Sequence, residues 1–489
     1  MSSTGFADVL ATLEPPLVWK HFLALTRIPR PSKREEQARE HVLAWARERE
    51  LAADVDTAGN VVVRVPAARG REDAPVVVLQ AHLDMVCERD ADSPNDPRAG
   101  RIEVVRDAEW VVAVGTTLGA DNGIGVAAAM AVAEDAEIEH GPLELLLTVS
   151  EEEGLDGAKA LDPGLVRGRI LVNLDGTSDA GLTVGCAGST HTFTRLPLRS
   201  EPTAHGSAAL EVAVSGARGG HSGGDIAKGR ANAIKALGRV LSRAYGRGPF
   251  SLGRLDGGVS RNAIPRGARA LVSVPAHAEA AFRESAEQEL AALREHYAGS
   301  DDGLVLAIEP AELQDAVDEV ATARALDLLA ALPTGVIALS PGLPGAVETS
   351  TSLNVASSDD RVLELSSMSR SSNPAGLEDV TATIEATARL AGADVESHRS
   401  YPPWRPDLDS RLLTTARVTF SRLFGHEPQL EVVHGGLECA VIGGKLEGVE
   451  MVAIGPDVVG LHAPGEHLSI PSTQRFYRLL GALLDDLSR

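Results

Sequence analysis

The pattern of apolar and polar positions changes near residue 188 and again near residue 401. Before residue 188, continuous apolar runs such as "APVVVLQAHLDMV" and "LELLLTVSEEEG" alternate with helical stretches. Continuous runs are typical of strands buried on both faces, and their alternation with helices predicts a mixed, mostly parallel sheet between helices. Two helices precede these strands, with a break at "IPRPS" where Ser32 could cap the second helix. We therefore predict an α/β domain.

The middle of the chain predicts a different kind of domain. "ALEVAVSG" and "ARALVSVPA" alternate apolar with polar residues, as strands with one solvated face do, and helical stretches lie between them. This pattern favours an inserted α+β domain with antiparallel sheet. Strands of the buried type and a final helix return after "SYPPWRP". We expect residues 1–187 and 402–489 to form the first domain and residues 188–401 to form the insertion.

Composition and charge narrow the possible partners. The 489 residues carry a formal net charge of −23, which disfavours nucleic acid and anionic membranes as partners. No apolar stretch reaches membrane-spanning length, and "MSSTGFADVL" lacks the basic start and apolar run of a signal peptide. The three cysteines are too widely spaced for a disulfide framework. We expect a cytoplasmic protein whose ligand is a small molecule.

Acidic and histidine residues stand at the ends of the predicted buried strands. They are His82, Asp84, Asp121, Glu151, Glu152 and Asp175. In an open α/β sheet the carboxyl ends of the strands form one crevice. "SEEEG" alone is consistent with a solvated acidic turn, but the whole group contains no lysine or arginine and would repel itself unless a cation were bound. The pattern predicts a pair of divalent metal ions with a bridging carboxylate.

Two features of this region allow alternative interpretations. His82 and Asp84 lie two apart in a strand and therefore point to the same face, so either both bind metal or one holds the other in place. "GIGVAA", residues 123–128, matches the G-x-G-x-x-A form of a dinucleotide-binding turn. That turn should follow directly from a strand, whereas "TTLGADN" intervenes here. We interpret these glycines as sites of close helix packing.

A series of ordered motifs resembles the Xaa-His dipeptidases, also called cytosol non-specific dipeptidases, of the aminoacylase and carboxypeptidase clan of co-catalytic zinc hydrolases. The motifs are "IPRPS", "AHLDMV", "LGADNGIGVA", "SEEEGLDGA", "NLDG", "GGHSGGDI", "SRNAIP", "HGGLECAVIG" and "HAPGEH". The resemblance implies two zinc ions. It implies that His82 and Asp175 bind one ion, that Glu152 and His462 bind the other, and that Asp121 bridges them.

The resemblance also implies roles around the metals. Glu151 would be the general base acting on the metal-bound water, and Asp84 would orient His82. Of the two histidines in "GLHAPGEHLSI", His462 fits the family's His-Ser/Thr-Pro-x-Glu pattern except that Ala463 replaces the hydroxyl residue. His467 is expected at the surface rather than on a metal.

In the inserted domain the resemblance implies a lid that closes on the substrate and joins two chains in a homodimer. His221 resembles the histidine that stabilises the oxyanion, and Asn262 and Arg370 match positions that hold the substrate. Gly435 and Gly436 stand where backbone N–H groups can approach a ligand closely. The neighbouring His434 and Glu438 have no assigned role.

The implied activity is zinc-dependent hydrolysis of dipeptides with a free C-terminus, including Xaa-His and carnosine-like substrates. Arg370 suits an α-carboxylate because its guanidinium can pair with both oxygens. Cobalt and manganese accept the same ligands as zinc. One alternative is an N-acyl-amino-acid deacylase of the same clan, whose catalytic half would look alike. The other is a non-catalytic metal-binding protein.

Overall fold

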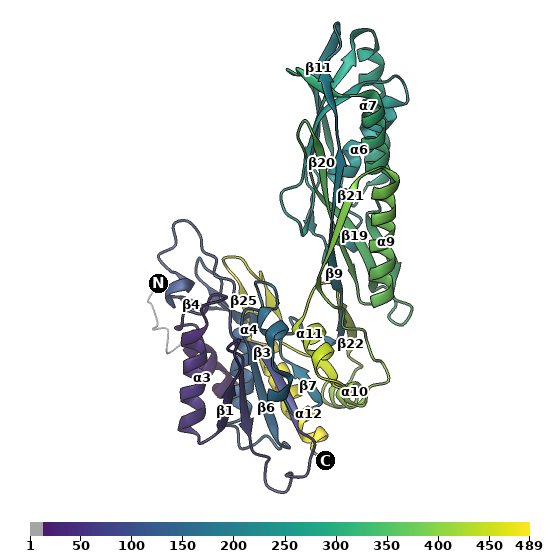
Figure 1. The fold of residues 1–489 in the computed structure, drawn as a ribbon. Helices are drawn as coiled ribbons and strands as arrows, with labels where there is room; N and C mark the ends of the chain where they lie inside the picture. The colour runs from purple at the N-terminus through teal and green to yellow at the C-terminus, as the bar shows by residue number, and fades with distance from the viewer. Residues whose placement is uncertain (1–12) are drawn as a thin grey trace. The chain divides into compact units, whose positions relative to one another are not determined.

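The computed structural model describes residues 13–489, which divide into two compact units (Figure 1). The first unit contains the described residues up to Gly185 together with Pro406–Val432 and Leu437–Arg489. The second contains Cys186–Arg405 and Val433–Gly436. Among the described residues, no helix has the length and apolar character needed to span a membrane.

The first unit is built on an eight-stranded mixed sheet in the order β1-β2-β6-β3-β7-β23-β8-β22. Its strands are β1 (Ala52–Val55), β2 (Val61–Val65), β3 (Val77–His82), β6 (Leu143–Thr148), β7 (Ile170–Asn173), β8 (Gly181–Cys186), β22 (Gln429–Val433) and β23 (Glu450–Ala453). The central strands β6, β3, β7 and β23 run parallel to one another. Every residue of β3 and β6 is buried, as their continuous apolar runs predict.

Helices and a small sheet surround this core. The helices are α2 (Pro16–Leu25), α3 (Glu36–Glu48), α4 (Ala120–Val132), α5 (Asp156–Ala160), α10 (Arg411–Phe424), α11 (Glu438–Lys445) and α12 (Ile470–Leu487). The small sheet contains β4 (Val104–Asp107), β5 (Trp110–Ala113), β24 (Val458–Val459) and β25 (His467–Ser469). The small side chains of α4 let it pack closely between α2 and β3, which is where "GIGVAA" lies.

The second unit is an antiparallel sheet with helices along one face (Figure 1). Its main strands are β9 (Gly188–Pro197), β11 (Ser207–Ser215), β13 (Ser251–Gly257), β15 (Ala268–Pro275), β16 (Val305–Pro310), β18 (Gly335–Leu339), β19 (Val347–Ser358), β20 (Val362–Ser371) and β21 (Asp394–Tyr401). Short pairs are formed by β10 (Ser200–Pro202) with β17 (Asp315–Val317) and by β12 (Gly220–His221) with β14 (Ala263–Ile264). The helices are α6 (Ala233–Tyr245), α7 (Glu279–His296), α8 (Glu319–Ala331) and α9 (Pro374–Leu390).

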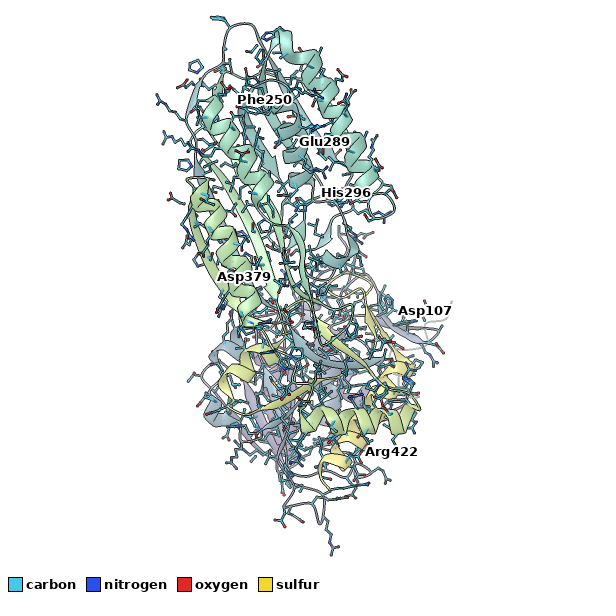
Figure 2. The ribbon with its side chains drawn as sticks, turned by 90° about the vertical axis from the view of Figure 1, so that its right-hand side faces the viewer. Asp107, Phe250, Glu289, His296, Asp379 and Arg422 are labelled. Atoms are coloured by element: carbon cyan, nitrogen blue, oxygen red, sulfur yellow. The ribbon has the colours of Figure 1, made fainter. Side chains whose placement is uncertain are left out.

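The core of the second unit lies between its sheet and its helices. Phe250 packs edge-on against Phe282 of α7, with ring centroids 5.3 Å apart (Figure 2). Glu289 of α7, labelled in Figure 2, pairs with Arg239 of α6, and Oε1 of Glu289 lies 2.6 Å from Nη2 of Arg239. Burial alternates along β9 and β11, as expected for strands with one face on a core. The predicted fold class, a mixed sheet between helices with an antiparallel α+β insertion, is confirmed.

The segment 433–436 belongs to the second unit, although the sequence analysis placed it with the C-terminal part of the first domain. Its contacts explain the difference. The backbone oxygen of Val433 accepts the N–H of Ala187, and His434 forms a 2.7 Å hydrogen bond between Nε2 and Oγ of Ser350. Residues 186–187 and 402–405 also belong to the second unit, where Trp404 pairs with the backbone of Cys186.

Candidate metal centre and substrate-binding residues

The predicted metal ligands come from segments that follow neighbouring strands of the first unit. β3 ends at His82, Glu152 follows the end of β6, and Asp175 follows the end of β7. Because these three strands are parallel neighbours, their carboxyl ends lie at one edge of the sheet. Asp121 lies in the first turn of α4, and His462 lies in the loop before β25 with a φ of 61°.

Asp121 lies between the two predicted metal-binding pairs. Its Oδ1 is 2.9 Å from Nε2 of His82, and its Oδ2 is 3.2 Å from Nε2 of His462. Nε2 of His82 is also 3.5 Å from Oδ1 of Asp175, and Nε2 of His462 is 3.0 Å from Oε2 of Glu152. Each oxygen of Asp121 therefore faces a different pair, which is the arrangement that a bridging carboxylate requires.

Asp84 contacts the side of the His82 ring opposite the one that approaches Asp121. Its Oδ1 is 3.3 Å from Nδ1 of His82, the ring nitrogen opposite the one that approaches Asp121. The same carboxylate accepts hydrogen bonds from Oγ of Ser32 at 2.7 Å and from the backbone N–H groups of Glu151 at 3.0 Å and Glu152 at 3.2 Å. This geometry favours the interpretation in which Asp84 orients His82 over the one in which it binds metal.

The charges of the site favour a bound cation. Burial, followed by the negative charges of Asp175 and Glu152, raises the pKa of Glu151 well above its ordinary value. Burial and the charge of Asp121 raise the pKa of Asp175 to about 6. Hydrogen bonds to Asp121 and Glu152 raise the pKa of His462 to about 10. The carboxylates thus repel one another, and their negative charges favour protonation of the groups beside them. Divalent ions bound at the site would replace those protons.

The residues present fit divalent metal ions. His82, Asp121 and Glu152 each offer one ligand atom, and these atoms lie within 4.8 Å of one another. Oε1 of Glu152 is buried and has no hydrogen-bond partner among the described residues, so it is available to a cation. Imidazole nitrogens together with carboxylate oxygens are a ligand set that zinc accepts.

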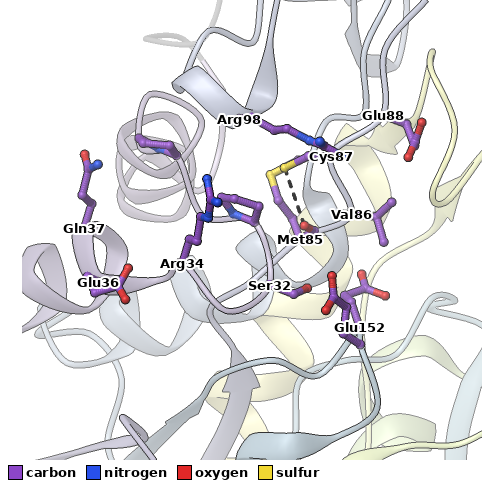
Figure 3. Close-up of a pocket in the computed structure, with 13 residues that line it drawn as sticks. Ser32, Arg34, Glu36, Gln37, Met85, Val86, Cys87, Glu88, Arg98 and Glu152 are labelled. Carbon is purple, nitrogen blue, oxygen red and sulfur yellow. Dashed lines mark hydrogen bonds between the residues drawn. The ribbon is translucent and has the colours of Figure 1, made fainter.

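A cavity of about 670 Å³ opens beside Glu152 in the first unit (Figure 3). Its wall includes Met85, Val86 and Cys87, which follow β3, and Arg34, which precedes α3. This volume lies in the range of about 300–1,000 Å³ that is typical of small-molecule sites. The first unit therefore has room for a small substrate next to a predicted metal ligand.

The second unit gathers two histidines around a buried arginine. Arg370 is 3% exposed, its Nη1 donates a 3.0 Å hydrogen bond to Oη of Tyr401, and its Nε has no partner within the part of the chain that the structure describes. Burial and then the positive charge of Arg370 lower the pKa of His221. The same two causes lower the pKa of His434 to about 4. A buried guanidinium near two neutral histidines is suited to binding an anion.

The other predicted substrate-binding residues lie near this arginine or next to its neighbours. The backbone oxygen of Asn262 accepts the N–H of Ser222, beside His221. Its exposed side chain accepts a 2.6 Å hydrogen bond at Oδ1 from Oγ of Ser260. A Cβ at position 436 would lie 2.8 Å from the ring of Tyr401, so this close approach requires Gly436. Gly435 separates Gly436 from His434.

Two further residues of the motifs, His467 and Glu153, lie apart from the ligand group. His467 packs its ring edge-on against Trp110 at 4.9 Å, and its Nδ1 is 2.8 Å from the backbone oxygen of Gly465. Glu153 is exposed and pairs with Lys33 at 2.9 Å. Neither arrangement brings these side chains to the ligand group.

Glu438 lies beneath the strand ends. It is 1% exposed, and its Oε2 accepts hydrogen bonds from Gln80 at 2.6 Å and Thr148 at 2.5 Å. Oε1 of Gln80 in turn accepts a 2.5 Å hydrogen bond from Nδ2 of Asn173. Burial raises the pKa of Glu438 to about 8. The "HGGLEC" motif drew attention to His434 and Glu438, but their contacts come from strands that are distant in sequence.

Comparison with known proteins assigns the family. Residues 78–486 match peptidase family M20/M25/M40, and the chain belongs to this family. It is 37% identical over 480 residues to the cytosol non-specific dipeptidase of Escherichia coli (strain K12), covering 98% of this chain and 99% of that protein. The predicted family resemblance and the prediction of a peptidase enzyme are confirmed, and a non-catalytic metal-binding protein is disfavoured.

Solved structures agree with this assignment. The aminoacylhistidine dipeptidase from Vibrio alginolyticus superimposes with a TM-score of 0.89 at 35% identity, covering 97% of each chain. A tripeptidase from Staphylococcus aureus shares the fold, with a TM-score of 0.56 at 17% identity over 98% of this chain and 99% of that chain. The likeness therefore extends through both units of the chain.

Proposed function

We propose that this protein is a dipeptidase that uses two divalent metal ions, zinc in the first instance, to hydrolyse dipeptides with a free C-terminus. The proposed substrates include Xaa-His and carnosine-like dipeptides. The observation that carries the proposal is the position of Asp121, whose two oxygens face His82 on one side and His462 on the other. The names of two relatives similar over nearly the whole chain, a non-specific dipeptidase and an aminoacylhistidine dipeptidase, support the substrate class.

In this proposal five residues hold the metals. His82 and Asp175 bind one ion, Glu152 and His462 bind the other, and Asp121 bridges them. Ions bound there would polarise the scissile carbonyl and acidify a water molecule. The short distances among these side chains and the unpartnered Oε1 of Glu152 support the assignment.

Glu151 is the proposed general base and acid. It would take a proton from the attacking water and pass it to the amine that leaves, as a positioned carboxylate can. Its backbone N–H is held by Asp84, which also faces the ring of His82. Asp84 would therefore hold the metal ligand His82 and the general base Glu151 in fixed positions relative to each other.

The second unit would act as a lid that recognises the substrate. Arg370 would bind the α-carboxylate of the dipeptide, for which its buried charge and unpartnered Nε are suited. Asn262 would hold the substrate, as would the backbone N–H groups of Gly435 and Gly436. The neutral ring of His221 would donate a hydrogen bond to the oxyanion.

The competing activity is removal of an acyl group from an N-acyl amino acid. Such a substrate also has a free carboxylate, so Arg370 does not distinguish the two activities. Release of amino acids from Ala-His, β-Ala-His and N-acetyl-histidine separates them. We expect hydrolysis of the two dipeptides to be at least tenfold faster in kcat/KM, about 1.4 kcal/mol in transition-state binding. Faster cleavage of N-acetyl-histidine would support the deacylase instead.

We also propose a cytoplasmic homodimer formed through the lid unit. The name of the Escherichia coli relative places that protein in the cytosol, and the net charge of −23 suits a soluble protein that binds neither nucleic acid nor membranes. Sedimentation of the full chain tests the dimer. A mass of twice 51.2 kDa is expected, and a single-chain mass would exclude it.

A further inference from the structure

Arg30 is a buried arginine whose guanidinium donates hydrogen bonds to backbone oxygens of two segments. It is 1% exposed, and the carboxylates of Asp84, Glu466 and Asp121 lie near enough to favour its charged form. Its Nη1 donates to the backbone oxygens of Leu83 at 3.0 Å and Asp84 at 2.9 Å, and its Nη2 donates to that of Gly119 at 2.5 Å. Burying a charge is costly unless hydrogen bonds compensate for the lost hydration. Here they join the segment after β3 to the segment before α4.

Glu466 holds the same segment through its N–H groups. It is 2% exposed, its Oε2 accepts hydrogen bonds from Leu118 at 2.8 Å and Gly119 at 3.0 Å, and its Oε1 accepts one from Ala120 at 2.9 Å. Both oxygens are therefore used by three consecutive backbone groups. Glu466 also belongs to the loop that carries His462.

Gly119 lies where the two side chains meet. Its oxygen is bound by Arg30 and its N–H by Glu466. Its φ is 71°, in the left-handed region, and a Cβ there would lie 2.5 Å from Nη2 of Arg30 and 2.7 Å from Sδ of Met85. Glycine is thus required for the backbone to reach both partners. Asp121 follows two residues later.

We propose that Arg30 and Glu466 form a clamp on residues 118–120 that positions Asp121 for the bridging role. Arg30 fixes this backbone relative to the segment that carries His82, and Glu466 fixes it relative to the loop that carries His462. The clamp thus joins the three segments that meet at Asp121. The proposal rests on the proposed function only in requiring that Asp121 bind metal. Both clamp residues act by positioning and touch neither metal nor substrate.

Substitution of Glu466 by Gln tests the clamp. The amide keeps the shape but turns one acceptor oxygen into a donor that faces a backbone N–H. Loss of such a supporting contact typically weakens metal binding about 10–100-fold. We expect that loss when the chelator-stripped full chain is titrated with zinc in competition with a chromophoric chelator. Unchanged zinc affinity in a folded Glu466→Gln variant would overturn the proposal.

Glu144→Gln is the matched control. Glu144 is also 2% exposed, and its Oε2 accepts two backbone N–H groups, from Arg167 at 2.8 Å and Gly168 at 3.0 Å. It lies near the start of β6, at the opposite end of the strand from the ligands. We expect Glu144→Gln to lower the melting temperature but leave zinc affinity unchanged. Equal losses of zinc affinity in both variants would show a merely structural role and overturn the proposal.

Arg30→Lys provides a second variant. Lysine keeps the charge but concentrates its donors at one nitrogen, so it cannot span the three oxygens that the guanidinium reaches. We expect weaker zinc binding here as well, while wild-type affinity would contradict the part assigned to Arg30. The titration contains no dipeptide. A wild type that binds two ions but cleaves no dipeptide would therefore refute the proposed function alone, whereas a wild type that binds no metal would refute both.

Discussion

The backbone N–H of Glu151 donates a 3.0 Å hydrogen bond to Oδ1 of Asp84, the same oxygen that lies 3.3 Å from Nδ1 of His82. One carboxylate therefore contacts both the backbone of the proposed general base and the ring of a proposed metal ligand. Asp84→Asn should disturb both, because one of its acceptor oxygens becomes an amide donor. We expect kcat and metal affinity each to fall by about 10–100-fold. Steady-state kinetics and metal titration check this, and a normal kcat would refute the role.

The three consecutive glutamates should differ in their effects. Glu151→Gln keeps the shape of the side chain but cannot take up a proton, so kcat should fall about 10²–10⁴-fold while both metals stay bound. Glu152→Gln should lose or weaken one metal, and excess zinc or manganese should restore part of the activity. Glu153→Gln should change little, because Glu153 is exposed and pairs with Lys33.

Metal analysis together with kcat for the three single variants distinguishes these roles. The exposed Glu153 serves as the internal control for a change of charge near the site. If Glu151→Gln loses a metal while Glu152→Gln keeps both, the roles assigned to the two residues are reversed.

Arg370→Ala tests recognition of the substrate carboxylate. A hydrogen bond to a charged group contributes about 1.5–3 kcal/mol, so kcat/KM for Ala-His should fall at least tenfold. The same dipeptide with an amidated C-terminus should lose much less, because it offers no carboxylate. Arg195→Ala is a suitable control, since Arg195 is exposed on the same unit and pairs with Glu364. Equal losses on both substrates would show that Arg370 does not bind the carboxylate.

Glu438 should make stability depend on pH. Burial raises its pKa to about 8 in the folded protein, above the value of about 4.3 for glutamate in an unfolded chain. Between these two values the folded protein keeps a proton that the unfolded chain has released, so stability falls as pH rises through this window. Glu438→Gln removes that dependence. The melting temperature of Glu438→Gln minus that of wild type, measured at equal metal content, should therefore increase from pH 5 to pH 8.5. A difference that stays constant over this range would contradict the prediction.

The sequence predicted the two-part architecture because continuous and alternating apolar runs report directly on how many faces of a strand are buried. It also predicted that the candidate ligands lie close together, since strand ends in a parallel sheet converge on one edge. It did not predict the supporting contacts. The prediction that Ser32 caps a helix was wrong: α3 has Glu35 at its N-cap, and Ser32 instead donates to Asp84, which lies across the fold.

The clamp shows the same limit of sequence reasoning. In the sequence, Arg30 resembles any charged residue after a helix, and Glu466 is simply part of the motif that contains His462. Their partners lie far away in sequence, in the segments around Asp84 and Gly119. Local patterns do not reveal which buried backbone groups need a donor or an acceptor, because that depends on the packed structure.

The most direct test of the account is stepwise return of metal to the chelator-stripped protein while Ala-His hydrolysis is recorded. We predict that the stripped protein is inactive and that activity returns with added zinc until two ions are bound per chain, because Asp121 links two binding pairs. Full activity in the stripped protein, or an activity that saturates at a single ion per chain, would contradict the two-metal dipeptidase proposed for this site.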